Sequence, residues 1–408
     1  MFIESLTAKT RVRQKFLPFT SPLISEDEIN EVSQTLRSGW LTTGPKTKLF
    51  EKKFAQYIGV RHAIAVNSGT AGLHLSLIAA GIKPGEEVIL PTLTFASTAN
   101  VVIHCGATPV LADVGDDMNI KISQILPLIN AKTKAIIPFH FAGQPAALTE
   151  ISAIAQKHNL IVIEDAAHAL GSSYRGKKIG SLSPITVFSL NQTNNITTCE
   201  GGMICTNHDA IADKIRILSL SALGGYHQDR TENYSNQDPL YYQIIVPPEA
   251  DYKYNITDIQ SAIGLCQLAK LDQFITTRRH YADLYNDAFR FIPEITIPPV
   301  ARDSFHTWHL YVILLNLEKL IINRSQFIQA LHYENIGASV HYIPFPLHPY
   351  YNRQQCHKLP HAASSSLAPN AEWLSERIIS LPLYPQMTQN DVYDTIRAIK
   401  KITKRMAK

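Results

Sequence analysis

Short apolar runs alternate with helix-like segments between about residues 61 and 206. Helix-like patterns at 71–80 and 148–158 are examples of the segments between the runs. Several runs are apolar almost throughout, which is typical of strands buried on both faces. The runs are HAIAV from residue 62, EVILP from 87, TPVLADV from 108, AIIPFH from 135, LIVIEDA from 160, TVFSL from 186 and GMICT from 202. The pattern predicts an α/β fold, with a mostly parallel mixed sheet flanked by helices.

The second part of the chain has a different pattern. A long helical segment, about 257–291, is ended by IPEITIPPV, and strand patterns at 308–315 and 337–343 then alternate with helical ones at 325–334 and 389–401. We therefore expect a large cofactor-binding α/β domain with an N-terminal arm over residues 1–266 and a smaller α+β domain over 267–408. The polar loop at 219–250 is too long for a simple connector, and its length predicts a lid or an interface segment.

The composition and charge of the chain argue against several classes of function. The 408 residues are 45% hydrophobic and 18% charged, and the net charge of +4 includes no basic block that would indicate nucleic-acid binding. The basic residues near the N-terminus, among them Arg11 and Arg13, are expected to form a solvated arm. No uninterrupted apolar window approaches 18 residues and no leader pattern opens the chain, so we expect neither a membrane span nor a signal peptide. Five scattered cysteines without a CxxC pair favour a cytoplasmic protein with reduced thiols, and the 16 histidines lack metal-ligand spacing, so no metal is expected.

Candidate chemistry follows the strands, since ligands of open parallel sheets bind at the carboxyl ends of the strands. After AIAV comes Asn67-Ser68-Gly69-Thr70, where a helix begins. Free N–H groups and the helix dipole favour a phosphate at such a position. An ordinary helix N-cap is the alternative.

An acidic pair, Glu164-Asp165, ends another buried strand. A buried acid requires a partner. That partner is either a bound cation, such as a protonated pyridine nitrogen, or a group of the protein itself, in a salt bridge or at a helix N-cap. Phe95 is suited to stacking on a flat ring, or else belongs to the core. His168 contacts a ligand or is structural, and Ser189 offers a hydroxyl to the same phosphate. Taken together, these strand-end residues describe a pocket for pyridoxal phosphate.

At this point the sequence resembles a known family, the fold-type I, pyridoxal-phosphate-dependent nucleotide-sugar aminotransferases of the DegT/DnrJ/EryC1/StrS type. The resemblance runs from about residue 17 to about 402. Among the matching stretches are AVNSGTAGLHLSL, IVIEDAAHALGSSYRGKKIGSL, NITTCEGGMICTN, YNITDIQSAIGLCQL and HYIPFPLHPYY. It implies amino transfer from glutamate to a keto-sugar nucleotide in surface polysaccharide or deoxyamino-sugar biosynthesis. It also implies a homodimer whose subunits share active sites, with pyridoxal or pyridoxamine phosphate as cofactor.

The resemblance also implies roles for single residues. Asp165 pairs with the pyridine nitrogen, His168 lies near the phenolic oxygen and Phe95 stacks on the ring. The remaining roles are phosphate binding by Gly69, Thr70 and Ser189, shaping of the sugar end by Trp40, Thr42 and Thr43, and a place near the mouth of the site for His341 and Tyr342.

The chain departs from the family pattern Thr-Lys-Asn-Ile-Thr-Thr-Gly-Glu-Gly-Gly at two positions. Asn194 stands at the position of the Schiff-base lysine, and Cys199 replaces a glycine. Leu190 replaces a phenylalanine upstream. Further on, Lys253 stands where the family places an asparagine that reaches the phosphate of the neighbouring subunit.

An asparagine amide is not nucleophilic and does not titrate near neutral pH, so Asn194 cannot do the work of a lysine. Four interpretations remain open. The chain is an altered member that binds pyridoxamine phosphate or free aldehyde, as in a dehydratase branch with histidine at this position. It carries an engineered substitution that was made to trap an external aldimine. Lys253 takes over from the partner subunit, or only adds a cation near the phosphate. Finally, the chain is an inactive relative.

Overall fold

The structure is a computed structural model that describes residues 11–220, 223–224, 243–244, 252–353 and 368–408. Its centre is a seven-stranded sheet in the order β1-β9-β8-β5-β4-β2-β3. Neighbours are parallel except that β9 runs antiparallel to both β1 and β8. The sheet is therefore mixed and mostly parallel, as predicted. Its strands are β1 (His62–Val66), β2 (Glu87–Pro91), β3 (Thr108–Ala112), β4 (Thr133–Ile136), β5 (Ile161–Asp165), β8 (Ile185–Ser189) and β9 (Gly202–Thr206).

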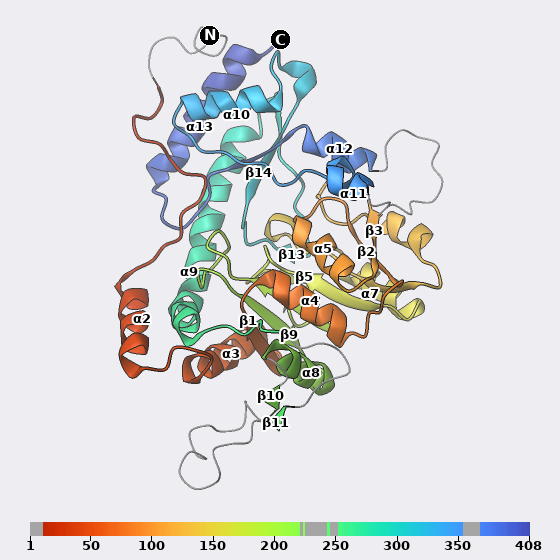
Figure 1. Ribbon diagram of the computed structural model, residues 1–408. Helices are drawn as coiled ribbons and strands as arrows, with labels where there is room; N and C mark the ends of the chain where they lie inside the picture. Colours follow the sequence, from red (N-terminus) through yellow and green to blue (C-terminus); the bar gives the residue numbers. More distant parts are fainter. Residues whose placement is uncertain (1–10, 221–222, 225–242, 245–251, 354–367) are drawn as a thin grey trace.

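Helices cover both faces of this sheet, which explains the uninterrupted apolar runs (Figure 1). In β2, Val88 and Leu90 pack into the cluster formed with one helical layer, whereas Ile89 packs into the cluster on the opposite face. Successive side chains of a strand point to opposite faces, so every position of β2 must be apolar or otherwise satisfied. The first layer contains α4 (Gly69–Ala79), α5 (Ala96–His104) and α8 (Asp209–Ser219), and the other face is covered by α3 (Pro45–Ile58) and α7 (Leu148–Lys157).

The long helix α9 (Asp258–Phe289) joins the large sheet to a second, smaller one (Figure 1). It begins with a capping box between Thr257 and Gln260. Residues in its first half pack in the core cluster of α3, and residues near its end pack in the cluster of the small sheet. The predicted boundary between residues 266 and 267 falls inside this helix, and the division into two domains stays a prediction.

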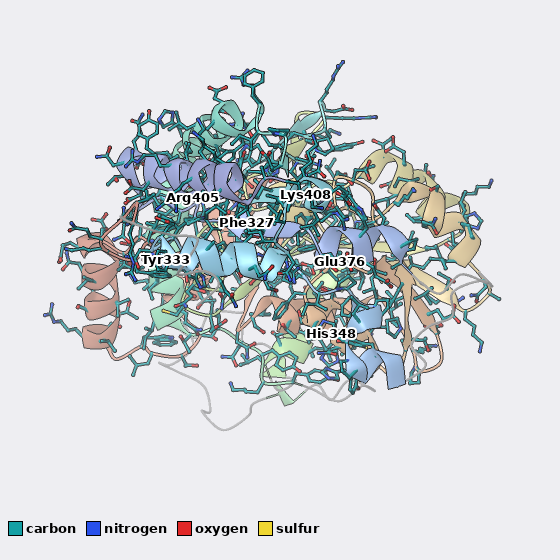
Figure 2. All side chains as sticks on the ribbon, turned by 90° about the horizontal axis from the view of Figure 1, so that it is seen from above. Phe327, Tyr333, His348, Glu376, Arg405 and Lys408 are labelled. Atoms are coloured by element: carbon teal, nitrogen blue, oxygen red, sulfur yellow. The ribbon has the colours of Figure 1, made fainter. Side chains whose placement is uncertain are left out.

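The small sheet is antiparallel and carries the last helices of the chain. Its order is β12-β14-β15, that is Ile295–Thr296, Tyr311–Leu315 and Ile378–Leu381. Figure 2 shows α10 (Arg324–Tyr333), which carries Phe327, and α13 (Gln389–Met406), which carries Arg405, side by side above it. The fully buried Phe327 packs in the same cluster as the apolar side chains of α13.

The remaining α-helices and strands of the described residues are mostly short. They are α2 (Glu26–Ser38), α6 (Ile122–Ile125), α11 (Pro349–Arg353), α12 (Pro369–Ser375), β6 (Ser173–Tyr174), β7 (Lys177–Lys178), β10 (Leu223–Gly224), β11 (Gln243–Ile244) and β13 (Ser304–Phe305). None of the described helices is long and apolar enough to cross a membrane. Most of the predicted lid or interface loop, 219–250, and Lys9 and Cys356 lie outside the described residues.

Two expectations for local structure are wrong. The predicted strand at 337–343 makes only an isolated bridge, in which Ser339 and Ser380 exchange backbone hydrogen bonds of 3.1 and 2.9 Å. Beyond it, His341 and Tyr342 line a cavity instead of continuing a ladder. The N-terminal arm is not simply solvated either, since Arg13 forms ion pairs of 2.5 and 2.9 Å with Asp391 and Asp394 of α13.

Candidate active site

A cavity of about 310 Å³ opens at the carboxyl ends of the central strands. Segments that follow β1, β2, β5 and β8 line it, because parallel strands end at the same edge of the sheet. Many of the residues proposed from the sequence meet here although they are far apart along the chain. They are Gly69, Thr70, Phe95, Asp165, His168, Ser189, Asn194, His341 and Tyr342.

At one end of the cavity, neighbouring segments of the chain lie so close together that two positions have no room for a side chain. Ser68 caps α4, with its hydroxyl accepting a hydrogen bond of 3.0 Å from the N–H of Ala71. A Cβ on Gly69 would lie 2.9 Å from the Cβ of Ser189, and one on Gly202 would lie 2.5 Å from the backbone oxygen of Ser68. Only glycine therefore fits at these two positions. The helix start, with its first-turn N–H groups and the Ser189 hydroxyl beside it, has the donors that a phosphate requires.

Asp165 lies at the base of the cavity and is 4% exposed. Its carboxylate accepts hydrogen bonds from the Thr98 hydroxyl at 2.8 Å and the Ala167 N–H at 3.2 Å. Burial raises the pKa of Asp165, and these two donors together with the nearby His140 offset part of the increase. Among the described residues no lysine or arginine forms an ion pair with it. A protonated pyridine nitrogen would supply the missing cation.

Behind Asp165, the fully buried Glu164 is satisfied within the protein. Its two oxygens pair with His140 at 2.7 Å and with the Thr186 hydroxyl at 3.1 Å. The Nδ1 of His140 accepts from the Ala146 N–H, so the proton of this imidazole lies on Nε2, towards Glu164. Of the two adjacent carboxylates, only Asp165 faces the cavity.

His168 and Tyr342 form a polar wall. The Nδ1 of His168 accepts a hydrogen bond from the Ala142 N–H, so its proton lies on Nε2, 3.0 Å from the Tyr342 oxygen. This arrangement leaves the Tyr342 hydroxyl hydrogen available to a ligand. Burial, and secondarily His341, holds the pKa of His168 well below its usual range, so the ring is neutral near pH 7. His341 in turn contacts the Ser380 hydroxyl at 2.7 Å.

Phe95 is 59% exposed, although it is a large aromatic residue at the wall of a cavity. It follows β2 as the residue before α5, and its ring centre lies 6.1 Å from that of Tyr342. An accessible aromatic face in a cavity suits a flat, ring-shaped ligand.

The loop after β8 carries Asn194 into the cavity wall. Asn194 is half-buried, and its backbone N–H donates to the Asn191 backbone oxygen at 3.0 Å. Cys199, further along the loop, is exposed and adopts a φ of 69°. This left-handed conformation favours glycine, which explains physically why the related pattern has glycine there.

Four of the residues proposed from the sequence do not line this cavity. Trp40 donates its indole N–H to the backbone oxygen of Thr43 at 3.3 Å, and Thr42 is exposed. The Thr43 hydroxyl contacts the Ile256 backbone oxygen and accepts from Asn255 at 2.8 Å. Lys253 is exposed and bridges Leu220 through its backbone. The roles that the resemblance implies for these four residues, with Lys253 acting from a partner subunit, therefore stay predictions.

The sequence interpretation missed several residues that line the same cavity. Ser97 and Phe139 follow β2 and β4, so the rule of strand ends could have found them. Thr98, which does not line the cavity itself but donates a hydrogen bond to Asp165, is three residues beyond Phe95. The missed residues of the wall also include Leu73, Ala167, Val187, Asn191, Thr193 and Glu200.

These features together fit pyridoxal phosphate or its amine form, except for the lysine. The buried carboxylate matches the pyridine nitrogen, the glycine-lined helix start matches the phosphate, and Phe95 matches the ring. No group of three or more metal-ligating side chains occurs among the described residues.

Comparison with known proteins agrees with this geometry. Residues 22–400 match the DegT/DnrJ/EryC1/StrS aminotransferase family. The chain is 46% identical over 394 residues to the spore coat polysaccharide biosynthesis protein SpsC of Bacillus subtilis, covering 96% of this chain and 98% of SpsC.

Two solved structures show the same fold. The putative sugar aminotransferase Spr1654 of Streptococcus pneumoniae, in its PMP form, is 30% identical with a TM-score of 0.85, covering 95% of this chain and 98% of that one. It is also known in a PLP form. Helicobacter pylori PseC, an aminotransferase involved in the biosynthesis of pseudoaminic acid, is 28% identical with a TM-score of 0.83, over 95% and 99% of the two chains. The fold is thus that of fold-type I aminotransferases, which use pyridoxal and pyridoxamine phosphate, and the chain belongs to the DegT/DnrJ/EryC1/StrS aminotransferase family.

Proposed function

We propose that this protein transfers an amino group to a nucleotide-linked keto-sugar for polysaccharide biosynthesis, and that it holds its cofactor without a covalent link. Glutamate is the proposed amino donor, a homodimer the proposed assembly and the cytoplasm the proposed location. The observation that supports the non-covalent site is the position of Asn194, which lines the same cavity as Asp165, Phe95 and Ser189. This is where the related family pattern places its lysine.

The residues of the chain divide the work of binding. Asp165 pairs with the pyridine nitrogen, the segment Ser68–Thr70 and Ser189 hold the phosphate, and Phe95 stacks on the ring. When bound, the cofactor supplies an electron sink and, in its amine form, the amino group itself. The neutral His168 holds the Tyr342 oxygen, so that the Tyr342 hydroxyl donates into the cavity.

We assign four residues to the site of the partner subunit: Trp40, Thr42, Thr43 and Lys253. Thr42 and Lys253 are exposed in the single chain, where a second subunit can reach them. We assign His341, which lines the cavity beside Tyr342, to the sugar side.

Asn194 sets the expected rate. It contributes hydrogen bonds but neither a nucleophile nor a base, and a positioned proton shuttle accounts for about 10²–10⁴-fold in rate. The unaltered protein should therefore bind the cofactor reversibly and transfer the amino group slowly.

The test is an absorbance titration with pyridoxal phosphate, followed by borohydride reduction and peptide mass mapping. We expect saturable binding with no modified lysine in the unaltered protein. Asn194→Lys should produce an adduct at residue 194 and raise transfer of ¹⁵N from labelled glutamate to a keto-sugar nucleotide by about 10²–10⁴-fold.

Gln192→Lys is the matched control, because it adds a lysine at an exposed position of the same loop that does not line the large cavity. It should give no adduct. A lysine adduct in the unaltered protein, or none at residue 194 in the variant, would disprove the assignment. Consumption of the sugar nucleotide without any need for glutamate would instead identify a dehydratase.

A further inference from the structure

His309 is a buried imidazole that lies behind the wall of the large cavity. It is 5% exposed and follows Trp308 in the segment before β14. It does not belong to the described lining of the cavity, which includes His168 and Asn194. Through two neighbours, however, His309 reaches both the polar wall and the loop that carries Asn194.

The first contact is with the loop after β8. Asn195, which follows Asn194 and is 4% exposed, donates from its Nδ2 to the Leu170 backbone oxygen at 2.9 Å. This bond fixes the orientation of the amide, so its Oδ1 lies 3.2 Å from the Nδ1 of His309. Because an amide oxygen only accepts hydrogen bonds, the Nδ1 of His309 must carry a proton and donate it to Asn195.

The second contact is with His168. The ring centres of His309 and His168 lie 4.1 Å apart, and the rings are tilted by 34°. Both edges of the His168 ring are already engaged, because its Nδ1 accepts from the Ala142 N–H and its Nε2 lies 3.0 Å from the Tyr342 oxygen. His309 covers a face of the same ring. A rotation of His168 would therefore have to displace His309 as well as break both edge contacts.

The backbone that carries His309 is itself tightly held. Trp308 adopts a left-handed φ of 52°, which is uncommon for a residue other than glycine. Arg278 of α9 is 2% exposed and binds this turn. Its Nη1 donates to the backbone oxygens of Leu383 at 2.6 Å, His309 at 3.1 Å and Trp308 at 3.4 Å. The position of the His309 ring is therefore set by α9 as well as by its own segment.

The surroundings also keep His309 neutral. Burial, and secondarily the neighbouring His168 and Arg278, holds the pKa of His309 well below its usual range. A neutral imidazole has a single N–H, and in His309 this N–H is committed to Asn195. His309 is thus a hydrogen-bond donor to the loop and, at the same time, an uncharged ring against His168.

We propose that His309 is a positioning residue for the cofactor site. It holds the loop of Asn194 through Asn195 and the face of His168 through its ring, and so keeps the Tyr342 hydroxyl directed into the cavity before the cofactor arrives. A side chain that is already ordered costs little on binding, whereas one that must first be ordered lowers the affinity. The proposal rests on the placement of the cofactor in the large cavity, which belongs to the proposed function.

Two substitutions separate the two contacts. Asparagine carries its Nδ2 close to the position of the imidazole Nδ1, so His309→Asn keeps the donor to Asn195 and removes the ring. His309→Phe keeps a ring against His168 and removes the donor. We expect each variant to weaken the binding of pyridoxal phosphate by about 2- to 12-fold in an absorbance titration, the effect of having to order one freed side chain.

Hydrogen exchange in the empty protein reports on the loop. The backbone N–H groups of Asn194 and Thr198 are hydrogen-bonded within residues 190–198. Their exchange should become about 5- to 150-fold faster in His309→Phe, because the buried Oδ1 of Asn195 loses its donor. It should stay unchanged in His309→Asn.

Spectra of ¹⁵N-labelled histidine report on the other contact. In the unaltered protein and in His309→Phe, His168 should carry its proton on Nε2 alone. In His309→Asn, the uncovered ring should give the averaged signals of a mobile imidazole. The opposite assignment of the two effects, or identical effects in both variants, would refute the two separate contacts.

His306→Phe is the matched control, because His306 is a second buried histidine of the same segment. Its Nδ1 accepts from the Trp308 N–H at 2.8 Å, and its ring stacks on that of Trp308. This variant should lose stability in urea unfolding and keep its cofactor affinity within about twofold of the unaltered protein. Equal losses of affinity in His306→Phe and in the His309 variants, or no loss in either His309 variant, would make His309 an ordinary core residue and overturn the proposal.

Neutron diffraction from crystals of the unaltered protein keeps the proposal testable if the variants fail to fold. It should locate a hydrogen on the Nδ1 of His309 towards Asn195 and one on the Nε2 of His168 towards Tyr342. A His309 that carries its only hydrogen on Nε2 would overturn the proposal. Failure of the unaltered protein to bind the cofactor would refute the proposed function, whereas cofactor binding without these hydrogen positions would refute the role of His309 alone.

Discussion

Replacing Asp165 by asparagine should have opposite effects on the empty protein and on cofactor binding. The carboxylate is 4% exposed, and in the described residues it has donors but no cation. Burial raises the pKa of Asp165, so the folded protein binds this proton more tightly than the unfolded chain does. The ionised carboxylate therefore reduces stability, and the reduction is complete once the pH exceeds the pKa of the folded state.

Asparagine removes that cost without losing the local hydrogen bonds. Its oxygen can accept from the Ala167 N–H, and its amide can donate to the Thr98 hydroxyl, which then donates to Thr94, 3.2 Å away. We expect Asp165→Asn to raise the urea midpoint of the empty protein at pH 7.5.

Cofactor binding should change in the opposite direction. Removing one partner of a buried, hydrogen-bonded charge pair costs about 2–5 kcal/mol. At 1.4 kcal/mol per factor of ten, this predicts a dissociation constant for pyridoxal phosphate that is weaker by roughly 30- to 4,000-fold. Fluorescence or absorbance titration measures it.

The adjacent Glu164 provides a control with the opposite sign for stability. Its oxygens accept from His140 and from the Thr186 hydroxyl. Glu164→Gln can keep an oxygen towards His140, but its amide then faces Thr186 and takes away the acceptor of that hydroxyl hydrogen, which should cost about 1–3 kcal/mol of unfolding free energy. If Asp165→Asn instead destabilised the empty protein as much as Glu164→Gln, or left cofactor affinity unchanged, the interpretation of Asp165 as an unpaired acid awaiting a cation would be wrong.

Two further predictions concern the phosphate end and the pH dependence. Gly202→Ala should cost about 1–3 kcal/mol of stability and also weaken cofactor binding, because its Cβ would meet the backbone of Ser68 and Gly69 at 2.5 and 2.8 Å. In the matched variant Gly201→Ala, the added Cβ would meet only side chains, that of Thr198 first. Urea unfolding should therefore show a loss of stability, and titration should show an unchanged affinity for the cofactor. Equal cofactor affinities in the two variants would contradict the phosphate site. Burial lowers the pKa of His341 to about 4, so the folded protein binds fewer protons than the unfolded chain and loses stability as the pH falls from 6.5 to 4. In urea unfolding, His341→Asn should reduce the slope of stability against pH in this range by up to about 1.4 kcal/mol per pH unit. The control His158→Asn, at an exposed position, should leave the slope unchanged. Equal slopes in the two variants would refute the role of burial.

The sequence by itself determined the class of fold and the position of much of the chemistry. A strand buried on both faces must be apolar at successive positions, as in β2, and this local requirement can be read along the chain. Parallel strands also bring their carboxyl ends to one edge, so the sequence already placed Gly69, Phe95 and Asp165 together. The sequence also placed Asn194 with these residues, and Asn194 lines the same cavity.

Only the tertiary structure decided which distant groups meet and which remain unpaired. Tyr342 contacts His168 across 174 positions of sequence, and Arg13 reaches Asp394 on the last helix. Trp40 packs over Gly44, outside the cavity to which the sequence had assigned it. Arg278 follows two threonines on a long helix, and its residue type predicts a solvated charge. Its burial against three carbonyl oxygens depends on how α9 packs on the segments before β14 and after β15, and no local pattern encodes such a long-range contact.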